Sequence, residues 1–239
     1  AIGDIMRNPM LGVKMTRRSQ MKVETKVIEE YTDEEIEKIT KVIEDTFNDK
    51  RQLYRYSPAY ILILNTGIRE GEALALPWDN LDTDIRIMSI ESSLSYVKDR
   101  CKDGHMKGRK IVISETKTIN GRRTIPLNQN ALDAIEEIKR RNKVQGITSD
   151  FVISDLNGNH LTPRNFYRTW ESITRRAGVE NKGVHALRHT FGSRALRAGV
   201  DIKVVSELLG HSNINITYDT YIHIIKEQKF EAVKELEFI

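Results

Sequence analysis

The sequence has little cysteine, little proline and no long hydrophobic run, and each shortage excludes a class of protein. Its single cysteine, Cys101, excludes a disulfide framework and a zinc site built from cysteines, and it suits a reducing cytoplasm. No run approaches the roughly 18 uninterrupted apolar residues of a membrane span. The first ten residues also lack the basic-then-apolar layout of a secretion signal. With 39% hydrophobic and 30% charged residues over 239 positions, the chain can bury a core under a charged surface.

The distribution of charge is more informative than the net charge of +4. Residues 1–26 carry six lysines and arginines against two acids, whereas residues 27–49 carry nine acids against two lysines. Such a reversal often marks a boundary, so we interpret the basic start as a linker or the tail of another domain. An ordinary frayed terminus is the alternative. Residues 160–200 hold eight lysines and arginines against two acids, which suits a phosphate-rich partner but is also typical of a solvated face.

The periodicity of apolar residues predicts an α+β, mainly helical fold with a small antiparallel sheet and an extended β-hairpin. A capping box of Thr32 and Glu35 begins the first helix, and Ser57-Pro58 begins a second that ends at Gly67. We expect strands over residues 85–90, 94–97, 110–113 and 123–127. Further helices are expected near residues 70–76, 131–138, 162–178, 187–199, 201–210 and 226–236.

The segment His185-Ala186-Leu187-Arg188-His189 places three polar side chains on one helical face. Taken alone, this face suits a metal site, a structural cluster that satisfies buried backbone groups, or an anion site. The metalloprotease motif requires a glutamate beside the first histidine, and Ala186 occupies that position. An anion site would use the arginine fork on phosphate oxygens and an imidazole for proton transfer.

Five further motifs decide between these interpretations. They are TGIREGE at 66–72, TKT at 116–118, RTIPL at 123–127, LGH at 209–211 and TYDTYIH at 217–223. In this order and with this spacing, the sequence resembles the catalytic domain of the tyrosine recombinase (phage integrase) family over about residues 30–239. The longer hairpin at 91–110 resembles that of integrases from conjugative transposons.

The resemblance implies a site that attacks a phosphodiester, where donors already in place must neutralise charge in the transition state. By resemblance, Arg69 and Arg188 clamp the scissile phosphate. Tyr221 is the nucleophile, and His185 is its base. Lys117 protonates the departing 5′ oxygen, and His211 contacts the phosphate site. The chemistry then needs neither a metal nor ATP, and no cofactor is expected.

Several assignments keep a rival residue. Tyr218 lies one turn before Tyr221, and the family spacing favours Tyr221 as the nucleophile. Lys107 or Lys110 could be confused with Lys117. We expect a structural role for His189 and an orienting role, not that of a general base, for Glu72.

The resemblance implies site-specific recombination of double-stranded DNA, through a covalent 3′-phosphotyrosyl intermediate, for the integration and excision of a bacterial mobile element. The expected assembly is a homotetramer on synapsed DNA, with an excisionase or a DNA-bending host factor as further partners. The expected location is the cytoplasm, at the nucleoid and away from membranes. A type IB topoisomerase and a DNA-binding module without catalysis are the alternatives.

The same resemblance divides the chain in two. Residues 1–30 are expected to be an interdomain linker or the remnant of an N-terminal core-binding domain, and residues 31–239 the catalytic domain with its C-terminal tail helix. The chain is then a fragment of a longer protein. The tail helix would dock on an adjacent protomer or pack on its own domain. The longer hairpin would contact a subunit or DNA, or it is an inert insertion.

Overall fold

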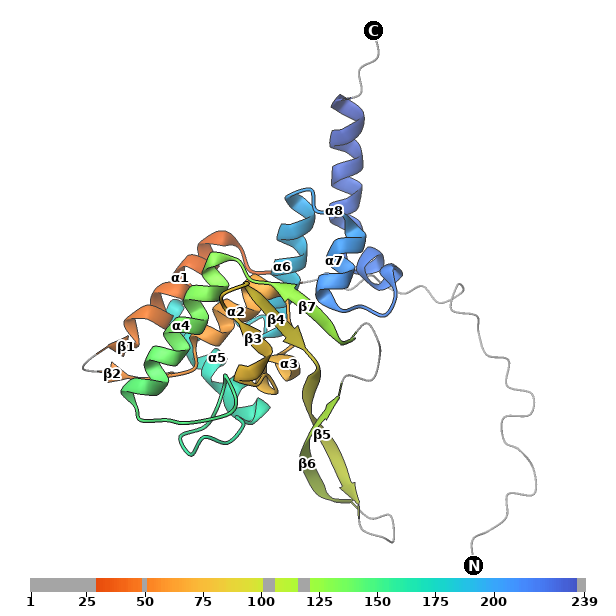
Figure 1. Cartoon of the computed structure of the whole chain (residues 1–239). Coiled ribbons are helices and arrows are strands. Elements are labelled where there is room, and N and C mark those ends of the chain that lie inside the picture. The colour runs from red at the N-terminus through yellow and green to blue at the C-terminus, as the bar shows by residue number, and fades with distance from the viewer. Residues whose placement is uncertain (1–28, 49–50, 101–105, 116–120, 236–239) are drawn as a thin grey trace, which may run out of the picture.

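The computed structural model describes residues 29–48, 51–100, 106–115 and 121–235 (Figure 1). The helices are α1 (Asp33–Asp45), α2 (Pro58–Thr66), α3 (Glu70–Leu74), α4 (Gln129–Val144), α5 (Pro163–Ala177), α6 (His185–Arg197), α7 (Ile202–Leu209) and α8 (Ile214–Glu235), with a short 3-10 helix at Trp78–Asn80. The strands are β1 (Phe47–Asn48), β2 (Arg51–Gln52), β3 (Leu81–Asp82), β4 (Ile87–Ile90), β5 (Ser92–Arg100), β6 (Met106–Glu115) and β7 (Arg123–Pro126). Most of the expected linker, residues 1–28, lies outside the described residues.

An aromatic cluster joins α2, α5 and the entry to α1. The ring of Tyr60 stacks on that of Phe166 at a centroid distance of 4.4 Å, and Trp170 packs 4.8 Å from Tyr60. The Trp170 Nε1–H group donates a hydrogen bond to the hydroxyl of Tyr31 at 3.2 Å, and the Tyr31 amide donates to Thr190 Oγ1 at 2.9 Å. Because buried aromatic pairs contribute stability beyond their apolar area, this cluster fixes α5 on α2, and the Tyr31 amide ties the entry of α1 to α6.

The sheet is small and antiparallel, as predicted. Strand β4 lies between β3 and β7, and the paired side chains of Met88 and Ile125 are both buried. Strands β5 and β6 form a separate hairpin that extends from the body of the molecule (Figure 1). The predicted fold class is therefore confirmed, with the hairpin as its own two-stranded ribbon.

The acidic start of the described chain pairs with part of the basic stretch at residues 160–200. Lys182 bonds to Glu35 at 2.6 Å, Arg197 bonds to Glu30 at 2.6 Å, and Arg194 pairs with Asp33. These pairs tie the segment before and at the start of α1 to α6 and the loop before it. Three of the eight basic residues thus already have carboxylate partners within the chain.

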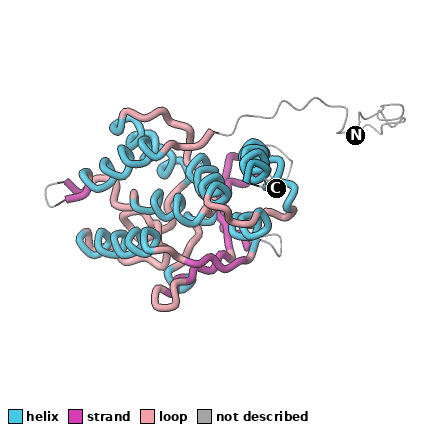
Figure 2. Tube along the Cα trace, turned by 90° about the horizontal axis from the view of Figure 1, so that it is seen from above, coloured by secondary structure: helices cyan, strands magenta, loops and turns pink. Residues whose placement is uncertain are grey.

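The expected start of the last helix was wrong. Helix α8 begins at Ile214 and not near Lys226, and it contains one non-helical residue, Tyr221, with φ −112° and ψ 23°. The run after Ile214 is rich in β-branched and aromatic residues, which have low helix propensity. Burial of Thr217 and Ile224, on either side of the kink at Tyr221, overrides that propensity. The C-terminal part of α8 projects away from the body of the molecule in Figure 1 and is seen end-on in Figure 2. No helix in the described part of the chain has the length and apolar character needed to cross a membrane.

Candidate active site

One open cavity of about 630 Å³ brings together five of the six predicted catalytic residues. Its lining includes Arg69 before α3, His185 and Arg188 on α6, His211 after α7, and Tyr221 on α8. The sixth residue, Lys117, lies outside the described residues. Side chains more than 150 residues apart in sequence thus share one surface.

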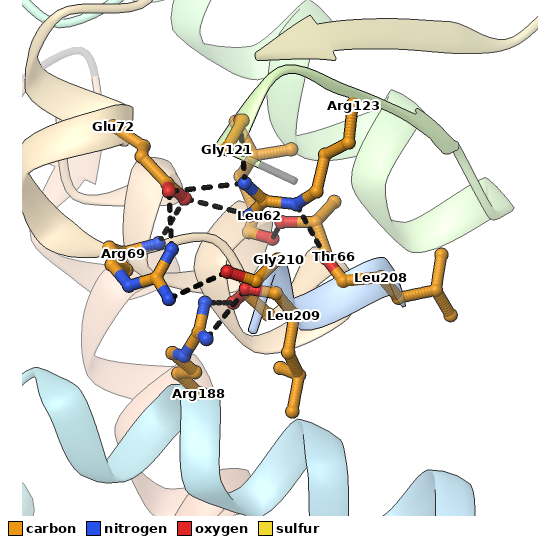
Figure 3. Close-up of polar contacts among 11 residues, drawn as sticks. Leu62, Thr66, Arg69, Glu72, Gly121, Arg123, Arg188, Leu208, Leu209 and Gly210 are labelled. Atoms are coloured by element: carbon orange, nitrogen blue, oxygen red, sulfur yellow. Dashed lines mark hydrogen bonds and ion pairs between the residues drawn. The ribbon is translucent and has the colours of Figure 1, made fainter. Parts of the chain in front are cut away.

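Arg188 is the more deeply buried of the two arginines, with 2% of its surface exposed. Its guanidinium donates to Gly67 O at 2.7 Å and to Leu209 O at 2.6 Å (Figure 3). Burial and the positive charge of Arg69 lower the pKa of Arg188 to about 9, which leaves the group charged at neutral pH. Gly67 ends α2 with φ 67°, where its carbonyl meets Arg188.

Arg69 is the more accessible arginine, with 38% of its side chain exposed. It caps α3, where its amide and guanidinium each donate to the carboxylate of Glu72 at 2.8 Å. Its Nη2 donates to Gly210 O at 3.0 Å. Burial alone would raise the pKa of Glu72, but hydrogen bonds and charge from Arg123 and Arg69 outweigh it, and the pKa is lowered. Glu72 therefore stays ionised and orients Arg69, in agreement with the orienting role expected for it.

Three histidines of the cavity favour the neutral imidazole. Burial, Arg188 and Arg69 lower the pKa of His185, and the same causes lower that of His211 to about 3. Burial and His185 lower the pKa of His189 to about 4. A neutral His185 at pH 7 is able to accept a proton, as a general base must. His211 Nδ1 is 2.7 Å from Thr217 Oγ1, which orients its ring.

His189, expected to be structural, also lines the cavity. Its ring lies edge to face with that of His185 at 4.6 Å and with that of Tyr221 at 6.3 Å. Among the described residues, no group of three or more histidine, cysteine or acidic side chains is arranged to hold a metal ion. His189 therefore contacts the rings of both His185 and Tyr221.

Tyr221 is 1% exposed and packs against Gly192 of α6, where any Cβ would overlap the phenol oxygen. Burial raises the pKa of Tyr221 to about 12, although Arg188 opposes the increase. Tyr218 is 38% exposed and lines a different cavity, together with Leu196 and Ile202. Tyr221, and not its rival Tyr218, therefore lines the cavity that holds the two arginines.

The sequence reasoning missed Arg123 as a site residue. It was noted only within the strand motif RTIPL, yet its guanidinium bonds to both oxygens of Glu72, at 3.1 and 2.8 Å. The signal that could have found it is a charged residue two positions before Ile125, on the same face of a short strand as that buried residue. A charge on a buried face needs a partner.

A model of the phage integrase family matches residues 29–228. The chain belongs to the phage integrase family. A tyrosine recombinase XerC-like protein of Caldanaerobacter subterraneus subsp. tengcongensis is 31% identical, over 98% of this chain and 60% of that protein. A tyrosine recombinase of Thermosipho africanus is 28% identical, over 98% of this chain and 69% of its own length. This member of the family thus spans about three fifths to two thirds of these relatives.

Solved structures agree on the fold of this family member. The Tn1549 transposon integrase in complex with transposon right-end DNA superposes with a TM-score of 0.71 at 22% identity, covering 98% of this chain and 73% of that one. The XerH site-specific recombinase bound to a palindromic difH substrate gives 0.58 at 22% identity, covering 87% and 53%. The expected catalytic-domain fold, with its extended hairpin, is confirmed.

Proposed function

We propose that this chain carries the catalytic domain of a site-specific DNA recombinase that integrates and excises a mobile element. The observation that carries the proposal is the shared cavity of Tyr221, Arg69 and Arg188. Two guanidinium forks suit the oxygens of one phosphate, and a phenol beside them is positioned to attack its phosphorus. Membership of the family and the DNA complexes of its structural neighbours support double-stranded DNA as the substrate.

In the proposed reaction, the Tyr221 oxygen attacks the scissile phosphorus, and the bond from phosphorus to the 5′ oxygen breaks. The products are a 3′-phosphotyrosyl link and a free 5′ hydroxyl. Because one phosphoester replaces another, a 5′ hydroxyl of the partner strand rejoins the ends by the reverse attack. Arg69 and Arg188 neutralise the charge that develops on the equatorial oxygens, and His211 contributes a contact to the same phosphate.

Proton transfer completes the proposed mechanism. The pKa of Tyr221, about 12, means that the phenol holds its proton at neutral pH. His185, whose pKa is lowered, accepts that proton during attack. Lys117 would donate a proton to the departing 5′ oxygen, the role that the family resemblance implies.

The proposal extends to the assembly. Residues 1–30 would be an interdomain linker or the remnant of a core-binding domain, and residues 31–239 the catalytic domain with the tail helix. A homotetramer would form on synapsed DNA, with an excisionase or a DNA-bending factor as additional partners. Such a protein would act in the bacterial cytoplasm at the nucleoid.

The test is covalent capture of DNA. We would incubate the chain with a pool of random-sequence duplexes nicked to release a short 5′ strand after cleavage, and resolve adducts on denaturing gels. The wild type and Tyr218→Phe should form an adduct, and Tyr221→Phe should form none. An adduct that survives Tyr221→Phe but disappears in Tyr218→Phe would refute the assignment, and no adduct with any variant would refute the catalytic proposal.

A further inference from the structure

Three consecutive backbone carbonyls at the end of α7 each accept a hydrogen bond from a different arginine. The pairs are Arg123 Nε with Leu208 O at 2.7 Å, Arg188 Nη2 with Leu209 O at 2.6 Å, and Arg69 Nη2 with Gly210 O at 3.0 Å (Figure 3). The last carbonyls of a helix lack intrahelical partners and carry the negative end of its dipole. The end of α7 therefore gathers guanidiniums that come from three separate parts of the chain.

The carboxylate of Glu72 is the second element of this cluster. Each of its oxygens accepts two hydrogen bonds, one from Arg69 and one from Arg123 (Figure 3). Glu72 is 2% exposed, so loss of half its donors would leave an under-satisfied buried charge. Arg123 donates both to this carboxylate and to Gly121 O. Among the described residues, neither of the other two arginines makes this pair of hydrogen bonds.

Arg123 does not line the cavity that holds the two arginines assigned to the phosphate clamp. Its side chain is 7% exposed, and a Cβ on Gly210 would lie 2.7 Å from its Nη1. All three of its guanidinium nitrogens already donate to protein oxygens. Its guanidinium is therefore committed to holding Glu72 and the end of α7.

We propose that Arg123 is a positioning residue for the phosphate site, because it joins Glu72 to the end of α7 and so fixes the relative placement of Arg69 and Arg188. This inference rests on the proposed function. Without Arg123, Glu72 would bond to Arg69 alone and neutralise its charge. With Arg123 present, Arg69 and Arg123 share the one carboxylate of Glu72, while Arg188 bonds to Leu209 O. Three guanidiniums and one carboxylate then leave a net charge of +2 beside the phosphate.

The test compares three variants of the whole chain. Arg123→Gln removes both the charge and the fork, whereas Arg123→Lys keeps the charge beside Glu72 but cannot bond to Glu72 and Leu208 together. Arg140→Gln is the matched control, because Arg140 forms an equally bidentate pair with Glu137 on the distant helix α4. Adduct formation is measured in single turnover at saturating protein, alongside thermal unfolding.

We expect Arg123→Gln to slow cleavage by about 100-fold, since small misplacements of catalytic groups have effects of that order. Arg123→Lys should slow it by about tenfold and lower the melting temperature by less than Arg123→Gln does. In an Arg69→Lys background, Arg123→Gln should add less than about threefold, because both residues act through Glu72. If Arg123→Gln lowered the cleavage rate by the same factor in the Arg69→Lys background as in the wild type, the proposal would be overturned. An Arg123→Gln rate within about threefold of the wild type would also overturn it.

A readout without DNA separates this proposal from the function on which it rests. Exchange of the Arg69 guanidinium protons with solvent, followed by ¹⁵N–¹H NMR, should accelerate in Arg123→Gln and remain unchanged in Arg140→Gln. If the wild type forms no adduct, the proposed function fails, and the exchange measurement still decides whether Arg123 positions Arg69. Unchanged exchange in Arg123→Gln would refute the positioning role.

Discussion

At the scale of single residues, the two arginines of the cavity differ in how much the fold depends on them. Arg188 is buried and satisfies two backbone carbonyls, whereas Arg69 is partly exposed and shares Glu72 with Arg123. A buried carbonyl without a donor costs about 1–3 kcal/mol, whereas a lysine at position 69 would keep the backbone amide bond and a positive charge beside Glu72. The stability of the fold therefore depends more on Arg188 than on Arg69.

The corresponding prediction compares two conservative changes. Arg188→Lys should lower the free energy of unfolding by about 1–3 kcal/mol, because one ammonium cannot reach both Gly67 O and Leu209 O. Arg69→Lys should cost clearly less. Urea denaturation followed by circular dichroism measures both values. Equal losses, or a larger loss for Arg69→Lys, would contradict the distinction.

Sequence reasoning found the residues of the cavity through motifs but not their dependence on one another. Arg69, His185, Arg188, His211 and Tyr221 lie in segments whose spacing resembles a family. The role of Arg123 depends on Glu72, 51 residues away, and on the end of α7. Such contacts follow from the tertiary arrangement of a strand and two helices, which no local pattern contains.

At the scale of elements, the site is assembled from helix ends. The C-terminal residues of α2 and α7, Gly67 and Gly210, adopt left-handed conformations with φ 67° and 66°. Their carbonyls and those just before Gly210 face the arginines. A glycine is needed at Gly67 for a second reason, because a Cβ there would overlap Phe191 of α6 and lie 2.9 Å from Leu209.

This double requirement is testable with a matched pair of glycines. Gly67 and Gly178 both end helices with φ near 65°, but among described residues a Cβ at Gly178 meets nothing within 4 Å. Gly178→Ala should cost about 1–2 kcal/mol of unfolding free energy from backbone strain. Gly67→Ala should cost about 1–3 kcal/mol more from overpacking.

Differential scanning calorimetry or urea denaturation of the two variants measures that difference. Gly67→Ala should in addition reduce DNA cleavage, because displacement of Phe191 moves α6, which carries Arg188. Equal stability of the two alanine variants would show that close packing at Gly67 has no energetic consequence.

The sequence was informative about helices with explicit start and stop signals. The capping box of Thr32 and Glu35 and the glycine at the end of α2 occur as predicted. It was uninformative where tertiary contacts decide, as in the two-residue strands and in the first half of α8. There, burial on α6 and α7 forms a helix from residues that prefer strands.

At the scale of the whole molecule, the cavity couples stability to pH. In the folded protein His211 stays neutral down to about pH 3 and His189 down to about pH 4, because their pKa values are lowered. The pKa of His185 is also lowered. Unfolded histidines take up protons near pH 6.5. The stability that the three neutral histidines give to the folded state is therefore complete above that pH and is lost as the pH falls. Glu70 acts in the opposite sense, because burial raises its pKa from 4.5 to about 7.

Three histidines outweigh one glutamate, so the free energy of unfolding should decrease from pH 7 to pH 5. Protonated Glu70 stabilises the folded state, because its pKa is raised there, and this contribution is lost as the pH rises from about 4.5 through 7. Glu70→Gln should therefore make the decrease toward pH 5 steeper. Denaturant titrations at pH 7, 6 and 5 measure the trend, and a rise in stability toward pH 5 would contradict it.

The central claim is that the oxygen of Tyr221 becomes esterified to DNA beside two fixed guanidiniums. Tandem mass spectrometry of the nuclease-trimmed, trypsin-digested adduct tests it most directly, because residues 204–226 form one tryptic peptide that contains both Tyr218 and Tyr221. We predict a nucleotide linked through its 3′ phosphate to Tyr221. A nucleotide on Tyr218, on another residue, or linked through its 5′ phosphate would contradict the account.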